Sequence, residues 1–176
     1  MASQQGLMKL VPPLNFACVE EGLYRSAGPR GINLPFVTDL NLNTVIWMAQ
    51  EDPLPEFLEF VEQKNIKFLR FGIGEVTTAW DPDVKRNIVG ALQALADASN
   101  GRILVSCTMG RHRTGTVIGC LRRLQKWSIA STFAEYRRFT GSNRYRVINE
   151  LHIETFERSF VELPDSENRP AWLQDA

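Results

Sequence analysis

Cysteine is scarce in this sequence of 176 residues, which holds only Cys18, Cys107 and Cys120. An odd number of cysteines without clustered spacing argues against a disulfide framework and against a zinc site. The two histidines, His112 and His152, do not make a metal site either, and we expect His152 on a helix surface or in the core. We therefore expect no metal or organic cofactor, and a reducing compartment such as the cytoplasm.

Long hydrophobic runs and an excess of charge are also missing. No segment approaches the ~18 uninterrupted apolar residues of a membrane span, and residues 1–9 are too polar and too short for a secretory signal. The 20 basic residues balance 20 acidic ones, and no stretch interleaves aromatic with basic residues as nucleic-acid-binding proteins do. We expect a soluble protein whose partner is neither a membrane nor a nucleic acid.

The length and the 44% apolar content are those of one domain with a single core. Apolar and β-branched runs between turn residues predict short strands, and amphipathic stretches predict helices. The expected strands cover residues 23–26, 44–48, 67–71 and 103–106, and the expected helices cover 55–64, 83–98, 114–126, 128–140 and 147–159. This alternation indicates a single-domain α/β fold with a short, mostly parallel central sheet flanked by helices.

The two ends of the chain fall outside these elements. We expect residues 1–10 to form a flexible N-terminal tail, residues 11–160 to form the domain, and residues 161–176 to form a C-terminal tail. Trp172 and Leu173 could pin that second tail to the core.

The most informative stretch lies between the strand at 103–106 and the helix that follows it. From Ser106 to Gly115 it reads Ser-Cys-Thr-Met-Gly-Arg-His-Arg-Thr-Gly, with five residues between Cys107 and Arg113. Backbone N–H groups of such a loop can converge on one point, and the dipole of the following helix strengthens this anion-binding concavity. We therefore expect a phosphate-binding loop made of Thr108, Met109, Gly110, Arg111, His112 and Thr114.

Cys107 is the candidate nucleophile of this loop. A cysteine attacks as the thiolate, which a helix N-terminus and neighbouring cations favour. Arg113 returns to the same point with a planar fork that pairs two phosphate oxygens at once, and Gly110 lets the backbone bend tightly against the ligand. The Thr114 hydroxyl could donate to the cysteine sulfur and make it a better leaving group in a second step.

Two other interpretations of the loop are less favoured. Gly110 and Gly115 bracket four residues as in a nucleotide-binding P-loop, but Thr116 stands where that motif requires lysine. Cys107 could instead be a small buried residue at a strand end, the usual position of a free cysteine. The arginine at the sixth position after it, the glycines and the strand-to-helix switch favour a reactive site.

Basic residues are concentrated between Cys107 and Arg146, where Glu135 is the one acidic residue. Arg111 and His112 lie inside the loop and are expected beside the phosphate. The rest of this basic block includes Arg122, Arg123, Lys126, Arg137, Arg138 and Arg144. Solvated helix faces are the simpler interpretation for Arg122, Arg123 and Lys126, whereas Arg137 or Arg138 could add to the phosphate site.

Several stretches outside the loop carry a family resemblance. They are Asn15-Phe16, Leu23-Tyr24-Arg25-Ser26, Asn33-Leu34-Pro35-Phe36, Thr44-Val45-Ile46-Trp47 and Glu135-Tyr136-Arg137-Arg138-Phe139, together with residues 11–16, 116–123 and 170–173. With the loop, they resemble the plant-and-fungal atypical dual-specificity phosphatases, and within them most closely the fungal oxidant-induced cell-cycle arrest proteins. The resemblance spans roughly residues 11–173 and implies a cytoplasmic, cysteine-dependent phosphatase. Its relatives act on phosphotyrosine-like esters and on diphosphoinositol phosphates.

One residue departs from the pattern of the wider phosphatase group. That pattern places histidine immediately before the nucleophile, where it orients the loop and helps to hold the thiolate, but this chain has Ser106. A hydroxyl can still make a hydrogen bond in the loop but carries no imidazole, so we expect low activity.

A phosphatase also needs an acid to protonate the leaving oxygen. We choose Asp81, in the turn that follows the third expected strand, and keep Glu75 and Asp83 as alternates. The competing interpretation is structural, because Asp81 followed by Pro82 is typical of a helix N-cap and a first-turn proline.

The expected function is hydrolysis of phosphate monoesters or diphosphoinositol phosphates through a phosphocysteine on Cys107. The substrate would be a phosphorylated protein or an inositol polyphosphate. The alternative is a weakly active or inactive phosphatase-like module that binds phosphorylated partners. Such a module could act in a regulatory complex with related proteins.

Overall fold

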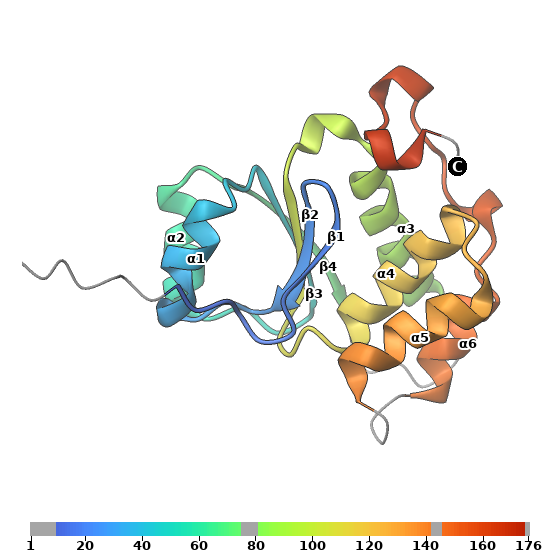
Figure 1. The fold of residues 1–176 in the computed structure, drawn as a ribbon, viewed down its shortest axis with the longest axis horizontal. Coiled ribbons are helices and arrows are strands. Elements are labelled where there is room, and N and C mark those ends of the chain that lie inside the picture. The colour runs from blue at the N-terminus through green and yellow to red at the C-terminus, as the bar shows by residue number, and fades with distance from the viewer. Residues whose placement is uncertain (1–9, 75–80, 142–145, 175–176) are drawn as a thin grey trace, which may run out of the picture.

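A computed structural model describes residues 10–74, 81–141 and 146–174 of the chain (Figure 1). One sheet has the strand order β1-β2-β5-β3-β4, made of β1 (Ala17–Glu20), β2 (Leu23–Ala27), β3 (Thr44–Ala49), β4 (Lys67–Ile73) and β5 (Ile103–Cys107). Strand β1 pairs with β2 in antiparallel fashion, and the other neighbours pair in parallel. The predicted α/β fold with a mostly parallel sheet is confirmed.

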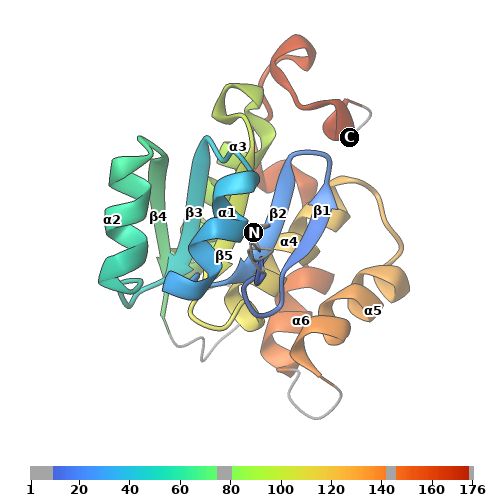
Figure 2. The same cartoon turned by 60° about the vertical axis from the view of Figure 1, so that its left-hand side comes forward.

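Helices cover both faces of this sheet (Figures 1 and 2). One face carries α1 (Leu34–Asp39) and α2 (Pro55–Gln63), and the other carries α3 (Pro82–Ala96), α4 (His112–Leu124), α5 (Ile129–Thr140) and α6 (Val147–Glu154). Successive side chains of β3 point to opposite faces of the sheet. Val45 belongs to the core beneath α2, and Ile46 belongs to the larger core beneath α3 and α4.

Most predicted elements are present, with three differences. Strand β1 and helix α1 were not predicted, since four and six residues are too few for a clear periodic pattern. The last predicted helix was expected to reach residue 159 but ends at Glu154. The chain turns there and buries Phe156 in the core, where its ring meets Phe160 edge-on.

The chain beyond α6 packs against the helical layer. It forms three short 3-10 helices, Arg158–Phe160, Ser166–Asn168 and Ala171–Leu173. Leu173 is buried in the larger core, and Gln125 Nε2 donates a hydrogen bond of 3.1 Å to the carbonyl of Trp172. Across the described part of the chain, no helix is both long and apolar enough to cross a membrane.

The sheet brings Cys107 to its carboxyl edge. Strand β5 lies between β2 and β3, with Ala27 opposite Cys107 on one side and Trp47 opposite Ser106 on the other. Ligands of α/β proteins bind at this edge, outside the carboxyl ends of the strands. The fold therefore places the predicted nucleophile where a ligand is expected.

Candidate active site

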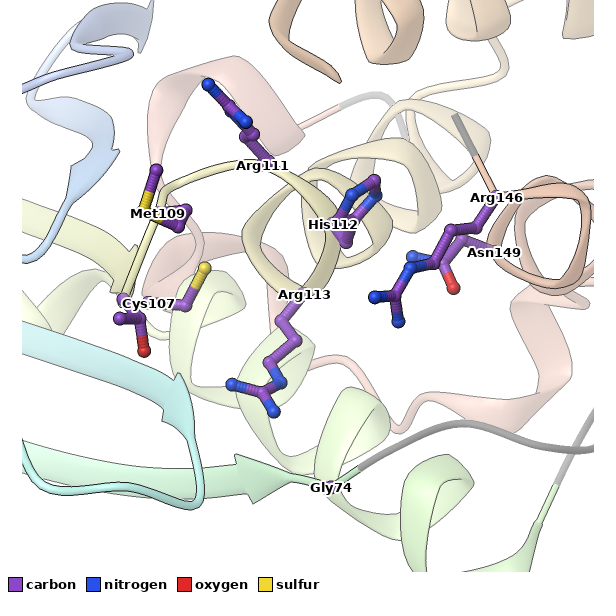
Figure 3. Close-up of a pocket in the computed structure, with 9 residues that line it drawn as sticks. Gly74, Cys107, Met109, Arg111, His112, Arg113, Arg146 and Asn149 are labelled. Carbon is purple, nitrogen blue, oxygen red and sulfur yellow. The ribbon is translucent and has the colours of Figure 1, made fainter. Parts of the chain in front are cut away.

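Cys107 ends β5, and α4 begins at His112, so a turn of four residues separates the strand from the helix. The helix was expected to begin at Thr114 but begins two residues earlier, inside the predicted loop. Its N-terminus and the side chain of Cys107 therefore face the same hollow, which the loop residues Thr108, Met109 and Arg111 also border (Figure 3). Cys107 is only 4% exposed, so a substrate must enter the hollow to reach the sulfur.

Gly110 allows the loop to lie directly against β2. Its backbone has φ +61°, and a Cβ atom there would lie 2.3 Å from the Ala27 nitrogen. The Gly28 N–H donates to the Cys107 carbonyl at 2.8 Å, which fastens the start of the loop to the residue after β2. Any larger residue at position 110 would push the loop away from the sheet.

Two side chains hold loop carbonyls from outside the loop. Asn15, itself at φ +57°, donates from Nδ2 to the Met109 carbonyl at 2.8 Å, and Arg25 donates from Nη2 to the Gly110 carbonyl at 2.8 Å. In a trans peptide the N–H points opposite to the C=O, so the Arg111 N–H points away from Arg25. Asn15 and Arg25 belong to stretches that carried the family resemblance, and both support the loop.

Ser106, the residue in place of histidine, is completely buried. Its hydroxyl donates to the Ser26 carbonyl of β2 at 3.0 Å. This hydrogen bond crosses between neighbouring strands, so Ser106 ties β5 to β2 beneath the loop.

Arg113 lies in the hollow and is paired with Glu51. Its Nη1 and Nη2 donate to the two carboxylate oxygens of Glu51 at 2.7 and 3.2 Å, and the guanidinium extends toward Gly74 at the end of β4 (Figure 3). These hydrogen bonds from Arg113 lower the pKa of Glu51. Sequence analysis missed Glu51, although its position two residues after β3, at the carboxyl edge of a parallel sheet, was a usable signal.

His112 borders the hollow from the first turn of α4. Its Nδ1 lies 3.2 Å from the Tyr136 hydroxyl of α5. Burial lowers the pKa of His112, and so do the positive charges of Arg146, Arg111 and Arg113. The neutral imidazole is therefore favoured near pH 7, and His112 offers a phosphate a hydrogen-bonding group rather than a charge.

The beginning of α6 contributes residues that sequence analysis did not single out as site residues. Arg146 and Asn149 border the hollow together with Arg111, His112 and Arg113. Arg137 does not take part, because its guanidinium pairs with Glu150 at 2.6 Å. The position of Arg146 at the end of the basic block was the signal that could have pointed to it.

Thr114 is buried directly behind the loop. Among the residues that the structure describes, its hydroxyl has no hydrogen-bond partner, the Cys107 sulfur included. The role of Thr114 toward the sulfur thus stays a prediction.

Asp81 and Asp83, two of the three acid candidates, lie beside the hollow rather than in it. Asp81 caps α3, where its Oδ1 accepts from the N–H groups of Asp83 at 2.9 Å and Val84 at 3.3 Å. It borders a neighbouring depression, which shares Gly74 with the hollow around Cys107. Asp83 pairs with Arg86 at 2.8 Å, and Glu75 lies outside the described residues.

Known proteins resemble this chain over most of its length. The model of the tyrosine phosphatase family matches residues 10–175. An Eremothecium gossypii protein named "Putative tyrosine-protein phosphatase OCA1" is 48% identical over 172 residues, which are 95% of this chain and 76% of that protein. A protein of the same name from Mycosarcoma maydis is 45% identical over 152 residues, 86% of this chain and 96% of that protein.

A solved phosphatase structure is also similar to this chain. The core catalytic domain of the PP-IP phosphatase SIW14 from S. cerevisiae, in complex with citrate, superposes with a TM-score of 0.77 at 33% identity. The match covers 85% of this chain and 89% of that domain.

Proposed function

The chain belongs to the tyrosine phosphatase family, and on that premise we propose that it hydrolyses phosphate esters or diphosphates through a phosphocysteine on Cys107. The observation that carries the proposal is the meeting of Cys107, the N-terminus of α4 and Arg113 around one hollow. A thiolate at a helix N-terminus is a nucleophile, and the same N–H groups can hold the phosphate that it attacks.

In the first step, the Cys107 sulfur attacks phosphorus as the bond to the leaving oxygen breaks. Loop N–H groups and Arg113 stabilise the charge on the phosphoryl oxygens in the transition state. A guanidinium has five N–H donors, and Glu51 takes one from each of Nη1 and Nη2. Three N–H groups are left for phosphate, so Glu51 can orient Arg113 without blocking it.

The proton for the leaving oxygen comes from Asp81 in this mechanism. Asp81 borders the depression next to the hollow, and the two share Gly74. In the second step, water attacks phosphorus, Asp81 takes the proton from the water, and the Thr114 hydroxyl turns toward the departing sulfur. The phosphate and the thiolate are then released.

We infer that the preferred substrate is a crowded polyanion such as a diphosphoinositol phosphate. One phosphate monoester occupies the loop and Arg113, but Arg111 and Arg146 add two cations that border the same hollow. A second phosphate group next to the reacting one would meet Arg146, whose guanidinium points toward Arg113, whereas the Arg111 side chain extends to the other side of the loop (Figure 3). The similarity to a domain named as a PP-IP phosphatase supports the same substrate class.

The test compares kcat/KM for a diphosphoinositol phosphate and a phosphotyrosine peptide at fixed salt. Arg146→Ala should reduce kcat/KM for the diphosphoinositol phosphate more than for the peptide. Arg138→Ala is the matched control, since Arg138 is exposed on α5 and does not border the hollow. Equal kcat/KM for both substrates, or equal losses in both variants, would contradict a polyphosphate site.

A phosphate-binding module with little turnover is the second candidate. Two observations favour it, because Ser106 replaces the imidazole and Asp81 is engaged as a helix cap. An activated aryl phosphate distinguishes the candidates. A burst with a trapped phosphocysteine identifies an enzyme, and phosphate binding without a burst identifies a module that could act in a complex with related proteins.

We also infer a cytoplasmic location. Cys18, Cys107 and Cys120 are all free thiols in the structure, as expected in a reducing compartment. Fractionation of the cells that express the chain tests this inference.

A further inference from the structure

Arg25 is a charged residue in the interior of the protein. It is the middle residue of β2, a strand that is buried along its whole length, and it is 1% exposed. Arginine is almost never fully buried without a partner of opposite charge. The burial of Arg25 therefore requires a physical explanation.

In the part of the chain that the structure describes, the partners of Arg25 do not include a carboxylate. Its Nη2 donates to the Gly110 carbonyl, and its guanidinium lies over the Phe139 ring, 3.7 Å from the centroid. Among the described residues, Nε and Nη1 have no hydrogen-bond partner, and no carboxylate lies within ion-pair distance. Arg122 is nearly as buried but pairs with both Glu20 and Glu135.

This positive charge persists at neutral pH. Burial lowers the pKa of Arg25 to about 10, while the charges of Glu135 and Cys107 raise it. A buried cation without a paired anion is costly, so an anion nearby would stabilise it. Gly110, whose carbonyl accepts from Arg25, donates its own N–H to the Cys107 carbonyl at 3.3 Å, so a negative charge on Cys107 would lie close to this cation.

The position of Arg25 puts its charge beneath the phosphate loop. A Cβ atom on Gly115 would lie 3.7 Å from Arg25 Nη2, and Nη2 also contacts Gly110. The end of the side chain therefore lies between the loop and the first turn of α4. Ser106 brings no charge to this region, since its side chain is a neutral hydroxyl that donates to the Ser26 carbonyl.

We propose that Arg25 is a positioning residue that holds the loop through Gly110 and supplies, from inside the protein, the positive charge that keeps Cys107 a thiolate. Arg25 thereby supplies the stabilisation of the thiolate that a histidine at position 106 would supply. The proposal rests on the proposed function only for the role of Cys107 as nucleophile.

Other charged or titratable groups act on the same two residues. Arg111, His112 and Arg113 from the loop and α4, and Arg146 from α6, border the hollow around Cys107. Arg25 is itself influenced by Glu135, Tyr136 and Arg122 on α5 and α4. The experiment must therefore change Arg25 alone and leave these groups in place.

The rate of alkylation by iodoacetamide measures the thiolate directly. The rate at Cys107 is followed against pH by peptide-resolved mass spectrometry, with the exposed Cys18 as an internal reference. Arg25→Met removes the charge at similar size, and Arg25→Gln removes it while an amide donor remains for the Gly110 carbonyl. We expect both to move the alkylation midpoint upward by about one pH unit or more, with about tenfold slower alkylation below the midpoint.

Asn15→Gly is the matched control. It removes the neutral clamp on the Met109 carbonyl, and glycine tolerates the positive φ at this position. We expect a lower affinity for inorganic phosphate and an unchanged alkylation midpoint. The proposal fails if both Arg25 variants keep the wild-type midpoint, or if Asn15→Gly moves it as far as they do.

Folding does not obscure this result. Removing an unpaired buried charge also removes its desolvation cost, and thermal unfolding verifies that each variant is folded. If Arg25→Met does not fold, Arg25→Gln decides the question. Alkylation needs no turnover, so the shift is measured whether or not the protein hydrolyses a phosphate ester. A failure of the proposed function can therefore be distinguished from a failure of the role proposed for Arg25.

Discussion

The loop around Cys107 takes its shape from residues far from it in sequence. Asn15 and Arg25 hold two consecutive carbonyls, and β2 fastens the Cys107 carbonyl through Gly28. Donors fixed before the ligand arrives need no reorganisation during the reaction, which is the main source of electrostatic stabilisation in enzymes. The proposed anion site is therefore one that is built from the backbone and does not depend on the sulfur.

Cys107→Ser should accordingly abolish turnover and leave phosphate binding largely intact. Serine keeps the size of the side chain but is not a thiolate nucleophile. Calorimetric titration with inorganic phosphate and a turnover assay on the same sample measure both properties. Retained turnover in this variant would overturn the covalent mechanism, and loss of phosphate binding would show that the sulfur is part of the anion site.

Glu51→Gln should lower kcat/KM by about tenfold, the effect expected for one charge-assisted hydrogen-bonded pair. The glutamine cannot accept from both Nη1 and Nη2 of Arg113 as the carboxylate does, so the guanidinium loses its fixed orientation. Asp52→Asn is the matched control, because it breaks the neighbouring ion pair with Arg70 instead. Similar kinetics for wild type and Glu51→Gln would exclude a positioning role for Glu51.

Elements with strong local signals could be predicted from the sequence, and contacts between elements could not. The strand before Cys107, the helix after it and the family resemblance are all confirmed. Glu51 and Arg146 were missed as site residues because only the strand order brings Glu51 to Arg113, and only the packing of α6 brings Arg146 to the hollow. Arg25 looked like part of a motif, and its burial beneath the loop is a tertiary property that no spacing in the sequence indicates.

The beginning of α3 allows a test that separates the two roles of Asp81. As an N-cap, asparagine is about as good as aspartate, so Asp81→Asn should barely change the thermal stability. As a general acid, Asp81 matters more when the leaving group is poor, and its loss should slow hydrolysis of a simple aryl phosphate by ~10²-fold or more. A strongly activated aryl phosphate should be hardly affected.

The test compares the hydrolysis rates of wild type and Asp81→Asn across substrates with different leaving groups. A uniform loss, or no loss at all, would remove Asp81 from the mechanism and direct attention to Glu75 and Asp83. Asp97→Asn provides the control for a cap of the same kind, since Asp97 accepts from the Ser99 N–H at 2.9 Å at the far end of α3.

The molecule as a whole joins its two helical layers at the carboxyl edge of the sheet. Glu51 follows β3 beside the layer of α1 and α2, whereas Arg113 and Arg146 come from the layer of α4 and α6. The ion pair between Glu51 and Arg113 therefore links the two sides across the site. Within the larger layer, Tyr136 and Phe139 of α5 contact His112 and Arg25, so the support of the loop extends through the helices to the sheet.

Global stability should fall between pH 7 and pH 5 because of the two histidines. Burial lowers the pKa of both His112 and His152 from 6.5, so the unfolded chain binds more protons than the folded one in this range. The free energy of unfolding then decreases as the pH falls from 6.5 through the lowered pKa values. Thermal unfolding of Cys107→Ser, which lacks the reactive thiol, should give a lower Tm at pH 5 than at pH 7, and His152→Gln in that background should reduce the difference. A Tm that is equal or higher at pH 5 would mean that the buried histidines take up protons without opposing the fold.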